Sequence, residues 1–161
     1  MSRIAHSCGV VPSHDALSLG LCGSFLPGRR QDAFHFPALT TSVAEARRRV
    51  LARLREWGMD EMACDDAQLV VSELVTNAVR HTDSDKVSCQ LRLSGTGLRI
   101  EVVDQGHAPT EPRARCSGTD EESGRGLLLV GALSHAWGVR PDDDGRGRVV
   151  WADLPHGRLT P

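Results

Sequence analysis

Glu73 and Asn77 are the residues of this sequence whose types and spacing most clearly indicate chemistry. They stand four positions apart in the segment Ser-Glu-Leu-Val-Thr-Asn-Ala-Val-Arg-His at 72–81. On a helix, side chains at i and i+4 share one face about 5–6 Å apart, so a carboxylate and a carboxamide can converge on one ligand. The carboxylate can take a proton, and the amide oxygen suits a hard cation such as Mg²⁺. The pair therefore indicates phosphoryl chemistry, although two such residues can also simply satisfy each other on a buried face.

Two further motifs follow in chain order. Asp104-Gln105-Gly106 ends an alternating apolar stretch, where Asp-x-Gly is ordinary turn chemistry. The same carboxylate could accept the exocyclic amine of adenine, with Gly106 letting the base approach the backbone. Gly124-Arg125-Gly126-Leu127 stands before an apolar run, so we expect it to precede a helix whose unpaired N–H groups favour phosphate. Their order along the chain, with a long polar segment between them, indicates a nucleotide site.

Composition limits the alternatives. The chain has 161 residues, 40% hydrophobic and 25% charged, as expected of one globular domain. A formal charge of -2 provides no general attraction to nucleic acid or to an anionic membrane surface. Five scattered cysteines without a C-x-x-C pair predict neither zinc nor a disulfide framework, and His81 alone beside Asn77 does not make a zinc site. Without a signal peptide or an apolar run of about 20 residues, the protein is expected to be cytoplasmic.

Hydrophobic periodicity predicts the elements that must position these residues. The spacing of apolar residues has a period near 3.6 in the predicted helices and a period of two in the predicted strands. A capping box is predicted at Ser42 to Glu45. The segment 107–123 has no period and is interpreted as an active-site lid. The predicted elements are an edge strand at 33–37, helices at 42–57, at 61 or 65 to 81 and at 127–133, and hairpins at 86–102 and 137–152.

The predicted fold class is α+β: a two-layer sandwich of a mostly antiparallel mixed sheet with helices packed on one face. Residues 1–32 are rich in Gly, Ser, Pro and His and are interpreted as a disordered or mobile tail. The domain is expected to cover 33–156, with a short C-terminal tail at 157–161.

Taken together, these motifs resemble those of a known family. Residues 73–81 match the asparagine box, Asp104-Gln105-Gly106 the first glycine box, and 122–130 the second glycine box of the GHKL or Bergerat-fold ATP-binding domain. This domain is shared by gyrase, histidine kinases, mismatch-repair ATPases and anti-sigma-factor serine kinases. The similarity covers about 34–155 and resembles most the small anti-sigma serine/threonine kinases. One departure is that Val149 and Val150 stand where many members carry a small polar residue near adenine.

The resemblance implies a role for each matched residue. Asn77 would coordinate the Mg²⁺ that bridges the ATP phosphates, and Glu73 would be the catalytic base that activates the attacking hydroxyl. Asp104 would recognise the adenine amino group, and Gly106 would shape the adenine pocket. The segment Gly124-Arg125-Gly126-Leu127 would supply the lid hinge and phosphate contacts, with Arg125 as a further phosphate partner.

The function implied by the resemblance is an ATP-dependent anti-sigma factor that binds a sigma factor and phosphorylates a small antagonist protein on serine. A second hypothesis is a non-catalytic module that uses ATP to order a sigma-binding surface. A third, a histidine-kinase catalytic domain, predicts an upstream dimerisation helix with a phosphoacceptor His, for which the tail is too short and too broken. The resemblance also implies self-association as a homodimer through a sheet or helix surface that the sequence does not identify.

Overall fold

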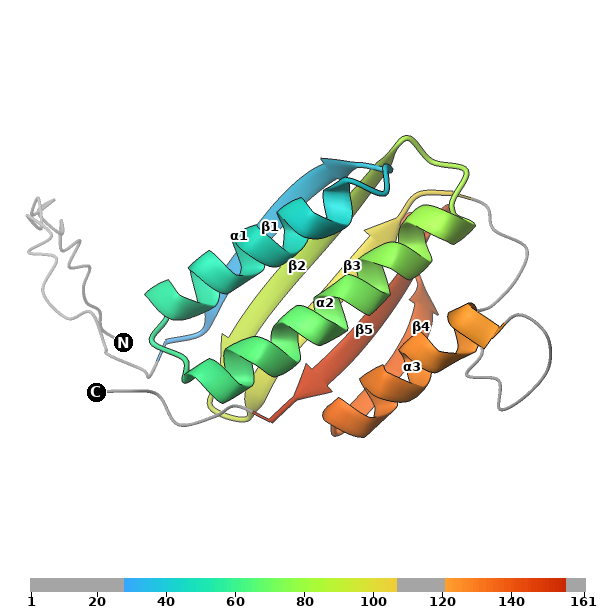
Figure 1. The fold of residues 1–161 in the computed structure, drawn as a ribbon. Coiled ribbons are helices and arrows are strands. Elements are labelled where there is room, and N and C mark those ends of the chain that lie inside the picture. Colours follow the sequence, from blue (N-terminus) through green and yellow to red (C-terminus); the bar gives the residue numbers. More distant parts are fainter. Residues whose placement is uncertain (1–27, 107–120, 156–161) are drawn as a thin grey trace, which may run out of the picture.

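The computed structural model describes residues 28–106 and 121–155 (Figure 1). Residues 1–27, 107–120 and 156–161 lie outside the described residues, and they include most of the predicted lid at 107–123. The last three residues of that predicted lid, 121–123, are the first residues of a helix. The described elements, in chain order, are β1 (Arg30–Pro37), α1 (Ser42–Glu56), α2 (Glu61–His81), β2 (Lys86–Ser94), β3 (Gly97–Asp104), α3 (Glu121–Leu133), β4 (Ala136–Pro141) and β5 (Arg148–Leu154).

The five strands form one sheet in the order β1-β2-β3-β5-β4, and the three helices lie on one face of it (Figure 1). The α+β prediction with helices on one face is therefore confirmed. The expected mixed sheet is not found, because all four pairings between the described strands are antiparallel. Each strand enters the sheet through a hairpin or beside a neighbour that runs the other way, so no parallel crossover is needed.

The core lies between the sheet and α1 and α2. Alternation with a period of two sends every second residue of β2 and β3 toward the helices, and these residues are buried. In α2, the apolar stripe that periodicity predicted is buried against them. The buried stripe of α2 consists of Ala63, Cys64, Ala67, Val70, Val71, Leu74, Val75 and Ala78.

The boundaries of α1 and α2 agree with the predictions except for one cap, whereas α3 begins six residues before the predicted 127. Gly58 follows α1 with φ of +76°, a left-handed conformation that favours glycine and ends the helix. Asp60 caps α2 by accepting a hydrogen bond from the Ala63 N–H. The predicted capping box is wrong: the Ser42 hydroxyl donates to the Pro37 carbonyl, and Glu45 pairs with two arginines of its own helix.

The sheet edge β1 begins at Arg30, three residues before the expected domain boundary. Arg30 is paired in register with Leu93 of β2, so the residues before Ala33 continue the ladder instead of forming a tail. No helix among the described residues has the length and apolar character needed to cross a bilayer.

Candidate active site

The C-terminal half of α2 presents a row of polar side chains toward α3. Positions 73, 76, 77, 80 and 81 recur at the helical spacing that puts them on one face. They form a small pocket of about 20 Å³, room for a water molecule, with the start of α3 as its other wall. The pocket is lined by Glu73, Thr76, Asn77, Arg80, His81, Gly126 and Leu127.

Four of the predicted site residues therefore meet in one place. Glu73 and Asn77 come from α2, and Gly126 and Leu127 come from α3, about 50 positions later in the chain. Leu127 is buried and ties α3 into the core, while the side chain of Arg125 is exposed on α3. Sequence reasoning missed Thr76 and Arg80 as lining residues, although their spacing of three and seven from Glu73 places them on the same face.

Gly126 lies directly against the carboxylate of Glu73. A Cβ added at Gly126 would lie 2.1 Å from Glu73 Oε2 and 3.0 Å from its Cδ, so any side chain here would force the Glu73 carboxylate to move. The missing side chain at Gly126 therefore lets the Glu73 carboxylate lie directly against α3. The contact places the predicted base next to the second glycine motif.

The prediction that Gly124 and Gly126 precede a helix is wrong. α3 begins at Glu121, so both glycines lie inside it and Gly126 is its sixth residue. The first four N–H groups of a helix have no partner within it, and Gly126 is beyond them. Two acidic residues at the start favour the first turn, which offsets the cost of about 1 kcal/mol for a helical glycine. In this structure Gly126 provides close packing against Glu73.

The residues of the pocket fit a magnesium ion that arrives with a phosphate ligand. The Asn77 Nδ2 atom is buried and has no hydrogen-bond partner among the described residues. Since the two ends of a carboxamide are assigned from their surroundings, Asn77 offers one unsatisfied polar atom at this wall in either orientation. Mg²⁺ is commonly held by one or two protein oxygens together with phosphates and water. Among the described residues there is no group of three or more His, Cys, Asp or Glu that could hold a metal ion.

Asp104 lies at the end of β3 and is 1% exposed. Its carboxylate accepts hydrogen bonds from the Gly106 N–H at 3.2 Å and from the Arg148 guanidinium at 3.3 Å, and also from the Thr82 hydroxyl. Burial raises the pKa of Asp104 above its ordinary 3.8, and this effect outweighs the lowering by Arg148 and by the hydrogen bonds. Asp104 thus sits in a polar cluster at the C-terminal end of α2.

This cluster adjoins the pocket because Thr82 directly follows His81, the last residue of α2. Gly106 is required for the packing here: a Cβ at this position would lie 2.2 Å from Asp83 Oδ1 and 2.4 Å from Thr82 Oγ1. The described residues that we predicted to bind nucleotide therefore lie in the C-terminal half of α2, at the end of β3 and in the N-terminal half of α3. Asp104 lies beside the pocket and does not line it.

Arg148 is the residue of this cluster that sequence reasoning missed. It stands directly opposite Asp104 in the antiparallel pairing of β3 and β5, and its side chain is 11% exposed. Because the two residues form a cross-strand pair, their side chains lie on the same face of the sheet. The departure noted at Val149 and Val150 is thus explained in part: the polar neighbour of Asp104 is one residue earlier, and it is an arginine.

The assembled groups can support proton transfer and anion binding. Glu73 is a half-buried carboxylate beside a carboxamide, and Arg80 and His81 bring a guanidinium and an imidazole to the same pocket. A carboxylate of this kind can act as a general base for a hydroxyl that is brought within hydrogen-bond reach. The guanidinium can pair with phosphate oxygens.

A sequence model of the histidine kinase-like ATPase domain matches residues 36–153. Among curated proteins, none matches the chain.

Two solved structures show likeness to the chain. The histidine kinase domain of a blue-light activated histidine kinase from Erythrobacter litoralis EL346 is 24% identical, with a TM-score of 0.44 over 75% of this chain and 62% of its own. The histidine kinase AdeS of Acinetobacter baumannii is 14% identical, with a TM-score of 0.40 over 80% of this chain and 70% of its own. The chain thus spans less than two thirds of the first of these structures.

Proposed function

The chain belongs to the histidine kinase-like ATPase family, and on this premise we propose that it is an anti-sigma factor with serine/threonine protein kinase activity. Its substrate would be a small antagonist protein that carries the acceptor serine, and its other partner would be a sigma factor. The observation that supports the proposal most directly is the meeting of Glu73, Asn77 and Gly126 in one pocket. A base and a metal ligand side by side are the two parts that phosphoryl transfer needs from a protein.

In the proposed reaction, Glu73 takes the proton of the acceptor serine hydroxyl as that oxygen attacks the terminal phosphorus of ATP, and the bond from this phosphorus to the bridging oxygen breaks so that ADP leaves. Asn77 would hold Mg²⁺, which would neutralise charge on the phosphate oxygens when bound with ATP. Arg80 lines the same pocket, and its guanidinium is proposed to contact the phosphates. Gly126 keeps α3 against Glu73 and so fixes where the carboxylate can lie.

Asp104 is proposed to receive the adenine amino group. An ionised carboxylate has about four acceptor positions, and three donors already use it: Gly106, Arg148 and Thr82. The base would therefore take the remaining acceptor position or replace one of these donors. An ionised Asp104 only accepts hydrogen bonds, whereas protonation turns one of its oxygens into a donor, so nucleotide affinity should weaken once it is protonated.

A phosphorylation assay tests the proposal. The protein is mixed with candidate antagonists, Mg²⁺ and radiolabelled ATP, and label on the antagonist is measured for wild type and Glu73→Gln. We expect label with the wild type and loss of label with Glu73→Gln, because an amide cannot take the proton. Glu45→Gln is the matched control, since Glu45 is an α1 glutamate that pairs with Arg48 and Arg49 away from the pocket. Full activity of Glu73→Gln would reject Glu73 as the base.

Nucleotide affinity measured with and without Mg²⁺ tests the role of Asn77. For Asn77→Ala we expect loss of the metal-dependent part of the affinity only, because the proposed contact of Asp104 with the base remains. An equal loss with and without Mg²⁺ would show that Asn77 is not the metal ligand.

A non-catalytic module that uses ATP to order a sigma-binding surface is the second candidate. The contact between Glu73 and Gly126 favours it, because this contact links the nucleotide pocket to the position of α3. Under this alternative, Glu73→Gln leaves ATP-dependent partner binding intact and no label is transferred even by the wild type.

A further inference from the structure

A second hollow lies at the other end of the sheet from the nucleotide pocket. It includes Gly97, the first residue of β3, whereas the nucleotide cluster includes Asp104, the last. The two ends are separated by roughly 23 Å of strand. The hollow has a volume of about 400 Å³, within the size range of small-molecule sites.

Four arginines line this hollow, which we call the arginine pocket. Arg29 and Arg30 come from the start of β1, Arg92 from β2 and Arg99 from β3. The lining also includes His135 and one acidic residue, Asp153. Such a concentration of guanidinium groups is unexpected on a chain whose formal charge is -2.

Only part of this positive charge is neutralised. Asp153 pairs with Arg99 through two hydrogen bonds of 2.6 and 2.7 Å. Arg30 donates to the backbone carbonyl of Trp57, which is uncharged. Among residues 28–106 and 121–155, neither Arg29 nor Arg30 forms an ion pair with a carboxylate. These two guanidiniums are therefore available to an anion.

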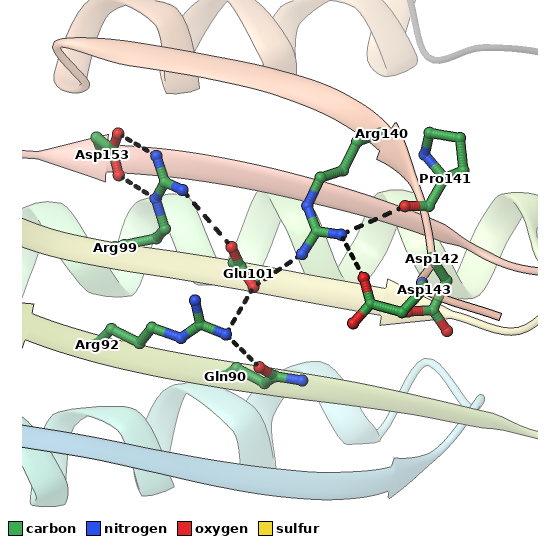
Figure 2. A network of polar contacts seen from close by, with 9 residues as sticks. All are labelled: Gln90, Arg92, Arg99, Glu101, Arg140, Pro141, Asp142, Asp143 and Asp153. Carbon is green, nitrogen blue, oxygen red and sulfur yellow. Dashed lines mark hydrogen bonds and ion pairs between the residues drawn. The ribbon is translucent and has the colours of Figure 1, made fainter. Parts of the chain in front are cut away.

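The remaining two arginines of the pocket, Arg92 and Arg99, both lie near the carboxylate of Glu101. It lies in the middle of β3 on the sheet face away from the helices and is only 2% exposed (Figure 2). Its carboxylate is shared by Arg92 at 3.7 Å, Arg99 at 3.8 Å and Arg140 at 3.4 Å. Charge-assisted bonds are usually about 2.7–2.9 Å, so none of these pairs is tight. One carboxylate among three guanidiniums orders them and leaves donors unused.

The charge balance of the pocket is positive. The four arginines contribute four positive charges, and Asp153 and the buried Glu101 contribute two negative charges, which leaves two positive charges. Arg140, outside the pocket, also draws on Glu101. A ligand with at least two negative charges would complete the balance.

Besides Asp153 and Glu101, Trp151 also contacts Arg99. Its guanidinium carbon lies 4.6 Å from the indole ring centre, a cation–π contact. Gly138 on the adjacent strand makes room for this indole, because a Cβ there would lie 3.0 Å from the ring. A guanidinium that is already ordered loses less entropy when it binds an anion. The same contact makes Trp151 a fluorescent reporter of what happens at Arg99.

We propose that the arginine pocket binds a small ligand with two or more phosphate groups, at a site separate from the nucleotide pocket. The planar fork of arginine matches phosphate oxygens two at a time, and four arginines line this hollow, Arg92 and Arg99 on the sheet face away from the helices and Arg30 beside the end of α1. The size of the hollow suits a small molecule more than a folded partner. Its distance from Glu73 and Asn77 means that both ligands can be bound together.

Calorimetric titration of the full chain with inorganic pyrophosphate tests this proposal. The titration is done in about 0.15 M salt, where exposed charges are largely screened, and without Mg²⁺, so that Asn77 cannot recruit the anion through a metal. We expect saturable binding with one pyrophosphate per chain and a change in tryptophan emission. Arg92→Gln and Arg30→Gln are each expected to weaken the binding at least about tenfold.

Two controls make the result specific. Arg48→Gln removes the same charge from an exposed α1 arginine that pairs with Glu45, and it should leave the affinity unchanged. Asn77→Ala should weaken nucleotide binding measured with Mg²⁺ and leave pyrophosphate binding unchanged. Circular dichroism and thermal unfolding of each variant verify that it is folded.

Three outcomes would overturn the proposal. The first is the absence of saturable binding up to millimolar pyrophosphate. The second is an equal loss in Arg48→Gln and Arg92→Gln, which would mean attraction to overall charge. The third is equal affinity for citrate, which would mean that the pocket does not distinguish phosphate from carboxylate.

Discussion

Gly126→Ala is predicted to separate the stability of this protein from its activity. The substitution adds one methyl group at the point where α3 touches Glu73. Its Cβ would lie 2.1 Å from Glu73 Oε2, whereas real Cβ atoms essentially never come within 3.0 Å of another heavy atom. The difference, 3.0 − 2.1 = 0.9 Å, is the least distance by which the carboxylate oxygen must move.

The cost in stability is expected to be small. Alanine inside a helix is favoured over glycine by about 0.8–1.0 kcal/mol. Moving Glu73 off its preferred rotamer costs about 0.5–1.5 kcal/mol, and its flexible side chain can make this move. The two terms nearly cancel, so the free energy of unfolding should change by less than about 1 kcal/mol.

The cost in activity is expected to be large. A displacement of about 1 Å of a catalytic group can lower a rate about 100-fold, because the reacting atoms leave their productive alignment. The assay is the rate of label transfer to the antagonist at saturating ATP, beside urea unfolding of the same preparation. We expect a loss of one to two powers of ten in the rate, with a nearly unchanged unfolding midpoint.

Gly131→Ala is the matched control for this substitution. Gly131 lies in the same helix and gains the same helix propensity, and its Cβ would meet the indole of Trp137 at 3.1 Å, away from Glu73. We expect Gly131→Ala to keep its activity. Normal activity of Gly126→Ala would refute the reasoning that this contact positions the base. A loss of activity accompanied by unfolding would refute the claim that the effect is local.

Two further predictions concern the cluster around Asp104. Gly147→Ala should lower the free energy of unfolding, measured in urea, by about 1–3 kcal/mol, because its Cβ would lie 2.2 Å from the Asp104 carbonyl oxygen. Gly95→Ala is the control and should leave the free energy of unfolding unchanged, because no atom lies within 4 Å of its Cβ. Burial raises the pKa of Asp104 above 3.8, so between 3.8 and the raised pKa the folded protein binds more protons than the unfolded chain. As the pH falls through this window, unfolding titrations should show wild type gaining stability relative to Asp104→Asn, and a constant difference would contradict the shift.

Much of the fold could be predicted because its patterns are local. The apolar stripe of α2 and the alternation in β2 and β3 depend only on residues a few positions apart, and their boundaries agree with the structure. The start of α3 could not be predicted, because two glycines break the helical pattern and packing against α2 outweighs their low propensity. The capping box failed for a related reason, since Ser42 finds a better partner in the Pro37 carbonyl across the turn.

The candidate site also has features that the sequence predicts and features that only the tertiary structure shows. Glu73 and Asn77 stand on one helix face by their spacing alone, so the sequence by itself determined that a carboxylate and a carboxamide would meet. Strand register decided that Arg148 faces Asp104, and it also gathered Arg92, Arg99 and Arg140 around Glu101. Register and helix docking join residues from distant parts of the chain through the packing of a whole sheet. Local patterns therefore determined which chemistry this protein carries, and only the tertiary structure decided what surrounds each charge.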